Sequence, residues 1–218
     1  MRRLIALALA GLVLAVLIVA QLVLPGIAAS RLRGQLGRSG TVLSVKVSAF
    51  PAIELLWGHA DKVVIRMGNY HSAARDVGNR LESAAGVGTI DASAQEFATG
   101  ALTLRNATLS KRGSELVGAA TVMQSDLRAA VPFLQGVQPI ASSDGQLILR
   151  GTASLLGLTA SVDAVVAASN GALVVAPDVP FGGIATITLF DNPHVHVQSV
   201  SAVGVPGGFR LNAQAKLQ

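Results

Sequence analysis

Two histidines form the clearest candidate for chemistry in this sequence. His194 and His196 are separated by one residue, and Asp191 lies just before them. On a strand, residues two apart point to the same face, so both imidazoles would lie where they can share a metal ion. A third ligand would have to come from a distant residue such as His59 or His71. The spacing is equally typical of two surface histidines on the polar face of a strand, and we expect no bound metal.

Catalytic motifs are absent from the sequence. It has no Gly-x-Ser-x-Gly elbow, no phosphate-binding Walker loop and no His-Glu-x-x-His pair. The carboxylates follow no spacing that would pair two of them, and the absence of cysteine excludes thiolate nucleophiles and thiolate metal sites. We therefore expect a protein that is not an enzyme and needs no cofactor. A hydrolase acting on envelope polymers is the less favoured alternative.

The composition is apolar and built from small residues. Hydrophobic residues make up 51% of the chain but aromatic residues only 4%, and there are 23 glycines. A core of Ala, Val and Leu fills volume poorly and would leave a lumen for an acyl chain, although codon bias in a GC-rich genome would enrich the same residues. The net charge of +5 is modest and includes no Lys/Arg run, so we expect no nucleic-acid partner.

The N-terminus carries an apolar run that predicts a membrane segment. Arg2 and Arg3 precede an apolar stretch from Leu4 to Leu24, in which Gln21 is the single polar residue. About 20 apolar residues suffice for a helix to cross a bilayer, and the arginines favour a cytoplasmic N-terminus. We interpret residues 1–28 as a signal anchor, or as a signal peptide cleaved in the small-residue tail Gly26–Ser30. The rest of the chain is then expected outside the cytoplasm, in the periplasm or cell wall.

A short basic connector is expected at residues 29–40, before a single domain at 41–218. Arg31, Arg33 and Arg38 lie in this connector and are our candidates for contact with lipid head groups or the membrane surface. A merely solvated linker is the alternative.

The domain is predicted to be α+β, with a strongly twisted, mostly antiparallel sheet that forms a partial barrel wrapped on one or two helices. Hydrophobic alternation and turn signals predict about nine or ten strands, of which residues 209–218 show the clearest pattern. Helices are predicted over 72–85, with Ser72 as the N-cap, and from Ser125, with Leu127, Val131 and Leu134 on one face. Between these two helices, strands are expected to resume near Ala101. Later in the chain, Asn170-Gly171 predicts a tight turn.

The most distinctive local sequence runs from Phe50 through Trp57 to Gly58. One interpretation is that its apolar side chains close one end of the sheet. The alternative is that they form the rim of a lipid cavity or insert into the membrane interface, where Trp is favoured. Together with the apolar face after Ser125, it supplies our candidate lipid-binding residues: Phe50, Ile53, Leu55, Leu56, Trp57, Leu127, Val131, Phe133 and Leu134.

The order of these pieces resembles the LmeA-like family of bacterial envelope phospholipid-binding proteins. The similarity rests on the membrane segment, Arg31–Leu36, Phe50-Pro51, Leu55–Gly58, Asp61–Ile65, Gly100–Leu104, Gly118–Thr121, Ser125–Pro132 and the Gly-punctuated strands that follow. The resemblance implies a twisted sheet wrapped on a helix, as in tubular lipid-binding domains. It also implies phospholipid binding and a role in the maturation of envelope glycolipids such as mannans.

The expected function is therefore that of a membrane-associated, envelope-facing protein that holds the acyl chain of a phospholipid or glycolipid in an apolar cavity. Burial of each CH₂ group would contribute about 0.8 kcal/mol. A non-catalytic scaffold that binds another envelope protein is the alternative. A continuous apolar cavity inside the folded domain would favour the lipid binder, and a solid core would favour the scaffold.

Overall fold

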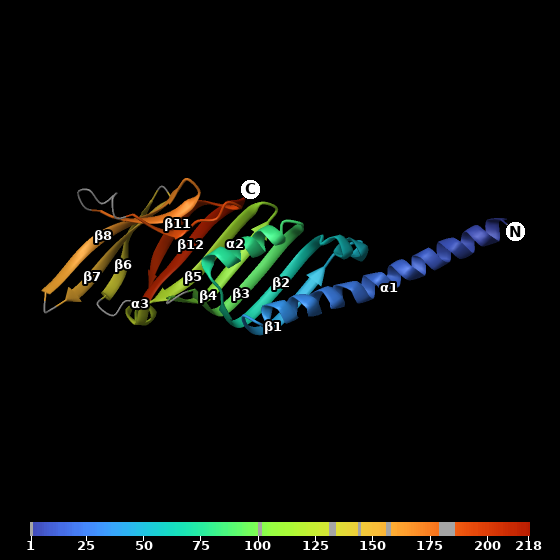
Figure 1. The fold of residues 1–218 in the computed structure, drawn as a ribbon, viewed down its shortest axis with the longest axis horizontal. Helices are drawn as coiled ribbons and strands as arrows, with labels where there is room; N and C mark the ends of the chain where they lie inside the picture. Colours follow the sequence, from blue (N-terminus) through green and yellow to red (C-terminus); the bar gives the residue numbers. More distant parts are fainter. Residues whose placement is uncertain (1, 100–101, 131–133, 144, 156–157, 179–185) are drawn as a thin grey trace.

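Strands dominate the structure and form two sheets (Figure 1). The computed structural model describes residues 2–99, 102–130, 134–143, 145–155, 158–178 and 186–218. The larger sheet has the strand order β1-β2-β3-β4-β5-β12-β11, and the smaller one the order β10-β9-β8-β7-β6. The prediction of a mostly antiparallel sheet with a few helices is confirmed. The larger sheet is not closed into a barrel, since β1 and β11 form its two edges.

The elements have the following bounds. The larger sheet contains β1 (Gly40–Ser48), β2 (Ala60–His71), β3 (Val87–Thr99), β4 (Leu102–Arg112), β5 (Glu115–Met123), β11 (Val195–Val205) and β12 (Gly208–Leu217). The smaller sheet contains β6 (Leu134–Ser143), β7 (Gln146–Leu155), β8 (Leu158–Ser169), β9 (Ala172–Pro177) and β10 (Ile187–Phe190). The helices are α1 (Arg2–Leu36), the 3-10 helix η1 (Ala52–Trp57), α2 (Ala74–Ser83) and α3 (Gln124–Ala130).

Helix α1 contains both the predicted N-terminal segment and most of the predicted connector. It is continuous through Pro25 and reaches Leu36, so residues 29–36 are helical and the expected boundary at residue 28 falls inside the helix. Its C-terminal half packs on β1 and η1, with Leu32 and Leu36 in contact with the strands. Among the residues that the structure describes, no helix combines the length and the apolar character needed to cross a membrane.

Helix α2 connects the one parallel pair of strands in the described part of the larger sheet. Strands β2 and β3 run parallel, with Val63 beside Ile90 and Tyr70 beside Phe97. A parallel pair cannot be joined by a tight hairpin and needs a crossover, which α2 supplies. The expected helix is confirmed, but the predicted cap is wrong. The N-cap is Ala73, without a side-chain hydrogen bond, and the Ser72 hydroxyl donates to the Ala73 carbonyl instead (3.3 Å).

Two further predictions differ from the structure. Strand β3 occupies residues 87–99, where no strand was expected before Ala101. Helix α3 ends at Ala130, so the expectation that Leu134 shares a helical face with Leu127 is wrong, because Leu134 begins β6. A proline at position 132 is unfavourable in a helix interior, which agrees with the early end of α3. The predicted Asn170-Gly171 turn is confirmed by positive φ angles at both residues.

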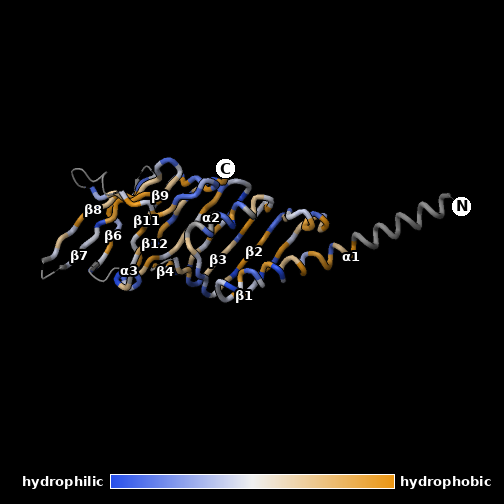
Figure 2. The backbone as a smooth tube through the Cα atoms, viewed as in Figure 1, coloured by the Kyte–Doolittle hydropathy of each residue, from blue (hydrophilic) through white to orange (hydrophobic). Residues whose placement is uncertain are grey.

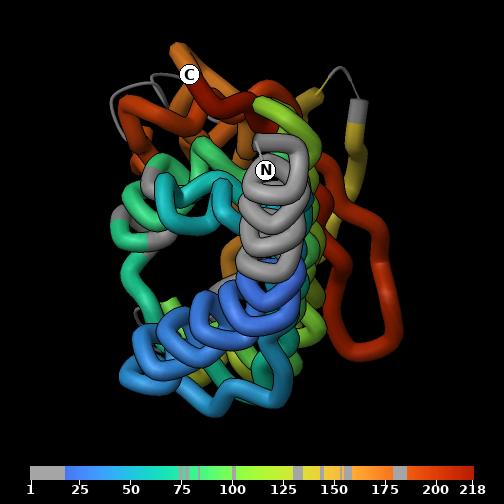
Figure 3. Tube along the Cα trace, turned by 90° about the vertical axis from the view of Figure 1, so that its right-hand side faces the viewer, coloured from blue at the N-terminus to red at the C-terminus, as the bar shows by residue number. Residues whose placement is uncertain are grey.

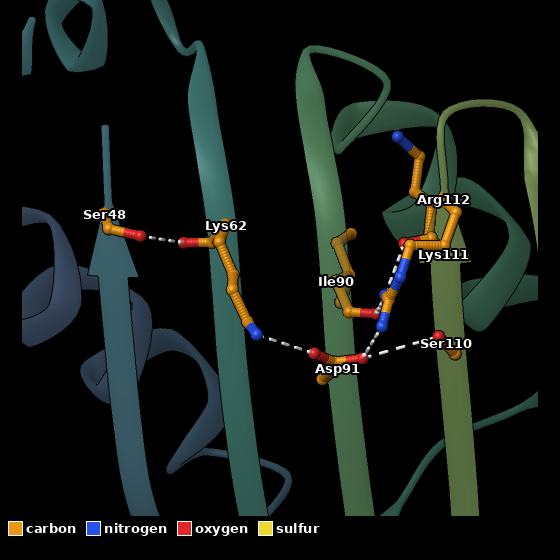
Figure 4. A network of polar contacts seen from close by, with 7 residues as sticks. All are labelled: Ser48, Lys62, Ile90, Asp91, Ser110, Lys111 and Arg112. Carbon is orange, nitrogen blue, oxygen red and sulfur yellow. Dashed lines mark hydrogen bonds and ion pairs between the residues drawn. The ribbon is translucent and has the colours of Figure 1, made fainter. Parts of the chain in front are cut away.

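The inner face of the larger sheet is apolar and its outer face carries charged pairs. In Figure 2, hydrophobic and hydrophilic segments alternate along the strands. Figure 4 shows Asp91 between two neighbouring strands, at 3.3 Å from the ammonium of Lys62 and 2.9 Å from the guanidinium of Arg112. The hydrogen bond from Arg112 is the main reason that the pKa of Asp91 lies below its ordinary value. These exposed ion pairs lie on the face of the sheet that contacts water. The opposite face is apolar and must therefore be covered by other elements.

A packed core joins the two sheets where β5, β12 and β11 meet the smaller sheet. Leu147 of β7 is fully buried there and packs with Val122 of β5 and Phe209 of β12. Over β1–β4 the inner face is covered differently. Viewed along the molecule, α1 and α2 lie on the same side of these strands (Figure 3), and the space between helices and sheet forms the site described next.

Candidate functional site: an apolar cavity under two helices

A large apolar cavity lies between the inner face of the larger sheet and the two helices α1 and α2. Its volume is about 1050 Å³, at the upper end of the roughly 300–1,000 Å³ typical of small-molecule sites. Strands β2, β3, β4, β5 and β12 form its floor, and α1 and α2 form its cover. The described lining contains neither a carboxylate nor a histidine.

The floor is hollow because most of its central positions carry small side chains. Antiparallel pairing places Ala92, Leu109, Gly118 and Ala213 side by side on four neighbouring strands. A Cβ built on Gly118 would meet a single neighbour, the carbonyl oxygen of Thr108 at 3.8 Å. Side chains that point to the same face of neighbouring strands fill the space above them in proportion to their size. Ala and Gly at these positions therefore leave depth that Leu or Phe would occupy.

The cover consists of one apolar face from each helix. Leu32 and Leu36 of α1 face the cavity, and Leu36 is buried. Leu81 of α2 and Ala84, the C-cap of this helix, also contribute, and Leu81 is buried as well. Helix α2 lies here because it belongs to the crossover between β2 and β3, which returns over the inner face of the sheet.

One end of the cavity combines an aromatic pair with two arginines. The rings of Tyr70 and Phe97 stack with their centroids 5.9 Å apart, and the Arg80 guanidinium carbon lies 5.7 Å from the Tyr70 ring centroid. Arg38 and Ser39 line the same end, since the Ser39 carbonyl accepts a hydrogen bond from the backbone of His71 (2.8 Å). In the described part of the chain, neither Arg38 nor Arg80 forms an ion pair with a carboxylate. This end therefore offers positive charge to an anion.

A buried lysine marks the opposite end of the inner face. Lys111 lies on β4 beside Ile90, and only 1% of its surface is exposed. Its ammonium donates hydrogen bonds to the carbonyl of Ala85 (3.4 Å), in the connection between α2 and β3, and to that of Val87, the first residue of β3. Burial lowers the pKa of the Lys111 ammonium below its ordinary value. The contact ties the end of α2 to the sheet and so fixes the cover of the cavity.

The predicted lipid-binding residues lie outside the described lining of this cavity. Phe50, Leu56 and Trp57 are exposed at η1, whereas Ile53 and Leu55 of the same helix are half-buried. Leu127 packs against the core between the two sheets. Leu134 begins β6, and Val131 and Phe133 lie outside the described residues.

Of the three arginines proposed for head-group contact, the structure places Arg38 at the cavity. Arg31 and Arg33 are exposed on α1 and are not among the lining residues. Sequence reasoning missed Tyr70, Phe97 and Arg80, together with the alanines of the floor. The alternation of alanine with polar residues in residues 89–94 was the available signal for β3 and its part of the floor.

The histidines considered for metal binding make other contacts. His194 lies 3.3 Å from the Glu82 carboxylate, and His196 lies 3.5 Å from the amide of Gln218. Over the described residues, no group of three potential ligands could hold a metal ion.

Comparison with known proteins supplies one match, and it covers most of the chain. The chain matches no curated protein and no solved structure. The model of the family described as LmeA-like phospholipid-binding matches residues 16–207, a span that contains the cavity lining from Leu32 to Ala120 and part of the core between the sheets. The chain belongs to the LmeA-like phospholipid-binding family.

Proposed function

We propose that this protein is a membrane-associated, envelope-facing carrier or holder of phospholipid, with the acyl part of the lipid in the cavity beneath α1 and α2. The observation that carries the proposal is the cavity itself, which is large and apolar in its lining. Transfer of an acyl chain from water into such a lumen is favourable by about 0.8 kcal/mol for each buried CH₂. A purely structural scaffold has no need for this hollow, so we favour lipid binding over the scaffold alternative.

The charged end of the cavity suggests how the lipid is oriented. Arg80 lies over the Tyr70 ring and Arg38 lines the same end, and neither forms an ion pair with a carboxylate among the described residues. Guanidinium groups form strong charge-assisted hydrogen bonds with phosphate. We propose that the lipid phosphate lies at this end and the acyl chain runs over the alanine floor. Arg31 and Arg33 remain candidates for contact with the membrane surface rather than with the bound lipid.

The location of the protein is also part of the proposal. The apolar run Leu4–Leu24 after Arg2 and Arg3 supports attachment to the cytoplasmic membrane with the domain on its outer side. The lining has no carboxylate or histidine in its described part, which supports a passive role rather than catalysis. Family resemblance supports participation in the maturation of envelope glycolipids such as mannans.

Lipid binding is tested directly on the purified full chain in mild detergent. We expect phospholipid to co-purify and to be visible by native mass spectrometry, and the delipidated chain to bind a fluorescent phospholipid. The double variant Arg38→Ala/Arg80→Ala should weaken binding of the phospholipid about tenfold or more, because two charge-assisted hydrogen bonds are lost. Binding of a neutral long-chain alcohol should stay unchanged.

Arg210→Ala is the matched control, because Arg210 is exposed and is not a lining residue of the cavity. It should bind phospholipid like the wild type. A chain that carries no lipid after purification and binds none after delipidation would overturn the proposal.

A further inference from the structure

An exposed apolar tip, formed by Phe50, Leu56 and Trp57, projects from the end of the larger sheet between β1 and β2. The exposed fractions of these residues are 79%, 65% and 68%. The neighbouring residue Ala52 is 1% exposed, so η1 has one face against the protein and one in solvent. Three large apolar side chains grouped in this way are unfavourable in water and indicate a contact surface.

The tip is held rigidly against α1 by the residue that interrupts the apolar run. The Gln21 side-chain amide donates to the Ala49 carbonyl (3.3 Å), and its oxygen accepts a hydrogen bond from the Ala52 backbone N–H (2.7 Å). On the other side, the Phe50 N–H donates to the Asp61 carboxylate (2.7 Å). The polar exception in the run Leu4–Leu24 thus fixes the backbone on both sides of Phe50 to the helix.

The tip continues a second exposed apolar surface on α1. Next to Gln21, Leu22 is 77% exposed and Val19 is 59% exposed. More than half of the exposed large hydrophobic residues that the structure describes lie in α1 and in residues 50–57. The contact between α1 and η1 therefore joins the tip to a helix whose sequence remains apolar back to Leu4.

We propose that the apolar tip docks in the interface of a lipid bilayer, beside the N-terminal part of α1. The occupant is a lipid surface, because the tip adjoins the exposed apolar residues of α1, and the sequence of this helix stays apolar back to Leu4. Trp is also favoured at the boundary between head groups and acyl chains. The inference rests on the membrane placement in the proposed function, but it does not require lipid in the cavity.

Docking of the tip would set the orientation of the cavity. On the protein side of η1, Leu55 packs in the same cluster as Leu32, Val63 and Ile90, which line the cavity. The tip therefore lies at the Ile90 end of the cavity, whereas Arg38 and Arg80 lie at the Tyr70 end. With the tip in the bilayer, the apolar end of the cavity lies nearest to the membrane.

Trp57 is the single tryptophan of the chain, so its fluorescence reports on the tip alone. The full chain is reconstituted into phosphatidylcholine vesicles, with and without lipids brominated at shallow or deep acyl positions. We expect a blue-shifted emission and the strongest quenching by shallow bromines. The double variant Phe50→Ser/Leu56→Ser should lose quenching severalfold, and Gln21→Leu should reduce it while keeping the helix apolar.

Val203→Ser is the control, because Val203 is 63% exposed on β11, far along the sheet from η1. It should be quenched like the wild type. Trp57 emission at the wavelength typical of water, with no quenching by the brominated lipids, overturns the proposal. A blue shift that depends on protein concentration, without quenching by the brominated lipids, also overturns it, because it would indicate that a second copy of the chain covers the tip. Binding of fluorescent phospholipid by Phe50→Ser/Leu56→Ser is measured as well. If this variant still binds the phospholipid, loss of bilayer contact by the tip is distinguished from loss of lipid binding in the cavity.

Discussion

Strand β12 passes through two regions of the molecule that differ in how completely they are filled. Near its start, Phe209 is 3% exposed and packs with Val122 and Leu147. Two alternate positions further on, Ala213 is part of the cavity floor. Both residues point to the same face of the same strand, one into a packed core and the other into a lumen.

The difference comes from the size of the side chains and from the element that covers them. In the packed region the smaller sheet covers β12 and supplies Leu147 and Val166, which fill the space. Over the cavity, the cover is made by α1 and α2, and the floor beneath carries Ala92, Gly118 and Ala213. An alternating strand thus specifies only which face is inside. Whether that inside is solid or hollow depends on residue volume.

The packed region should show the largest response to loss of volume. Leu147→Ala removes a side chain that is 0% exposed, and we expect it to lower the free energy of unfolding by about 2–5 kcal/mol. Denaturant unfolding of the delipidated chain, followed by circular dichroism, measures the change. Val203→Ala, at an exposed site, should cost less than about 0.5 kcal/mol. Equal effects of the two variants would remove the distinction between packed and hollow regions.

The hollow region should respond to added volume in the opposite sense. Ala213→Leu places an apolar side chain in the lumen, so the free energy of unfolding should change by less than the roughly 1–3 kcal/mol of overpacking a filled core. Binding of fluorescent phospholipid should fall severalfold because the lumen is smaller. Gln214→Leu places the same leucine side chain at the exposed neighbouring position of β12 and should leave binding unchanged. Strong destabilisation by Ala213→Leu with intact binding would show that this part of the floor is packed.

The comparison also explains which parts of the fold were predictable. Strand β12 alternates Phe209, Leu211 and Ala213 with polar residues, and the strand predicted over residues 209–218 is confirmed as Gly208–Leu217. Strand β3 uses Ala92 and Ala94 as inward residues, and alanine gives too weak a contrast with its polar neighbours to indicate a strand. The alanine residues that leave space for the lumen are therefore also the reason that the sequence pattern did not indicate the strand beneath it.

The sequence predicted that an apolar cavity exists, but not which residues line it. A composition rich in Ala, Val and Leu suggested a lumen, and the structure contains one. Its lining depends on the parallel pairing of β2 and β3, which brings α2 over the sheet. That pairing joins segments through a crossover rather than a hairpin, and no local pattern in the sequence specifies it. The candidates around Trp57 were chosen because they are large and apolar, but three of them, Phe50, Leu56 and Trp57, are exposed in the structure.

Substitution of Lys111 tests whether its hydrogen bonds hold the cover of the cavity against the sheet. Lys111→Met keeps the apolar stem but removes the hydrogen bonds that Lys111 donates to two carbonyls, at a cost of about 1–3 kcal/mol that relief of the buried charge partly offsets. The pH dependence is more specific. Because burial lowers the folded-state pKa of Lys111, the unfolded chain binds more protons between that pKa and about 10.5. Wild-type stability should therefore rise across this window relative to Lys111→Met.

Unfolding free energies of both proteins, measured at several pH values from 7 to 10.5, give this difference directly. A difference that stays constant over the whole range would show that the Lys111 pKa is the same in the folded and unfolded states. Phospholipid binding by Lys111→Met is a second readout, and it should weaken if the contact with Ala85 and Val87 fixes the cover.

The smallest effect is expected at the joint between the two regions, where α3 leads from β5 to the smaller sheet. Arg105 of β4 donates two hydrogen bonds to Asp126 of α3, at 2.9 and 3.1 Å. These bonds lower the pKa of the Asp126 carboxyl below its ordinary value of 3.8. The pair therefore stabilises the fold above pH 4, and its contribution is lost as the pH falls through the folded-state pKa.

Asp126→Asn should lower the melting temperature by about 2–4 °C at pH 7, and the difference from the wild type should vanish toward pH 2. Glu96→Gln is the matched control, because Glu96 also faces Arg105, at 3.6 Å, but is more exposed than Asp126. It should have less effect at either pH. If Asp126→Asn unfolds the smaller sheet at a lower temperature than the larger one, the two regions are separate units of stability. A single shifted transition means that the packed core and the hollow sheet unfold together.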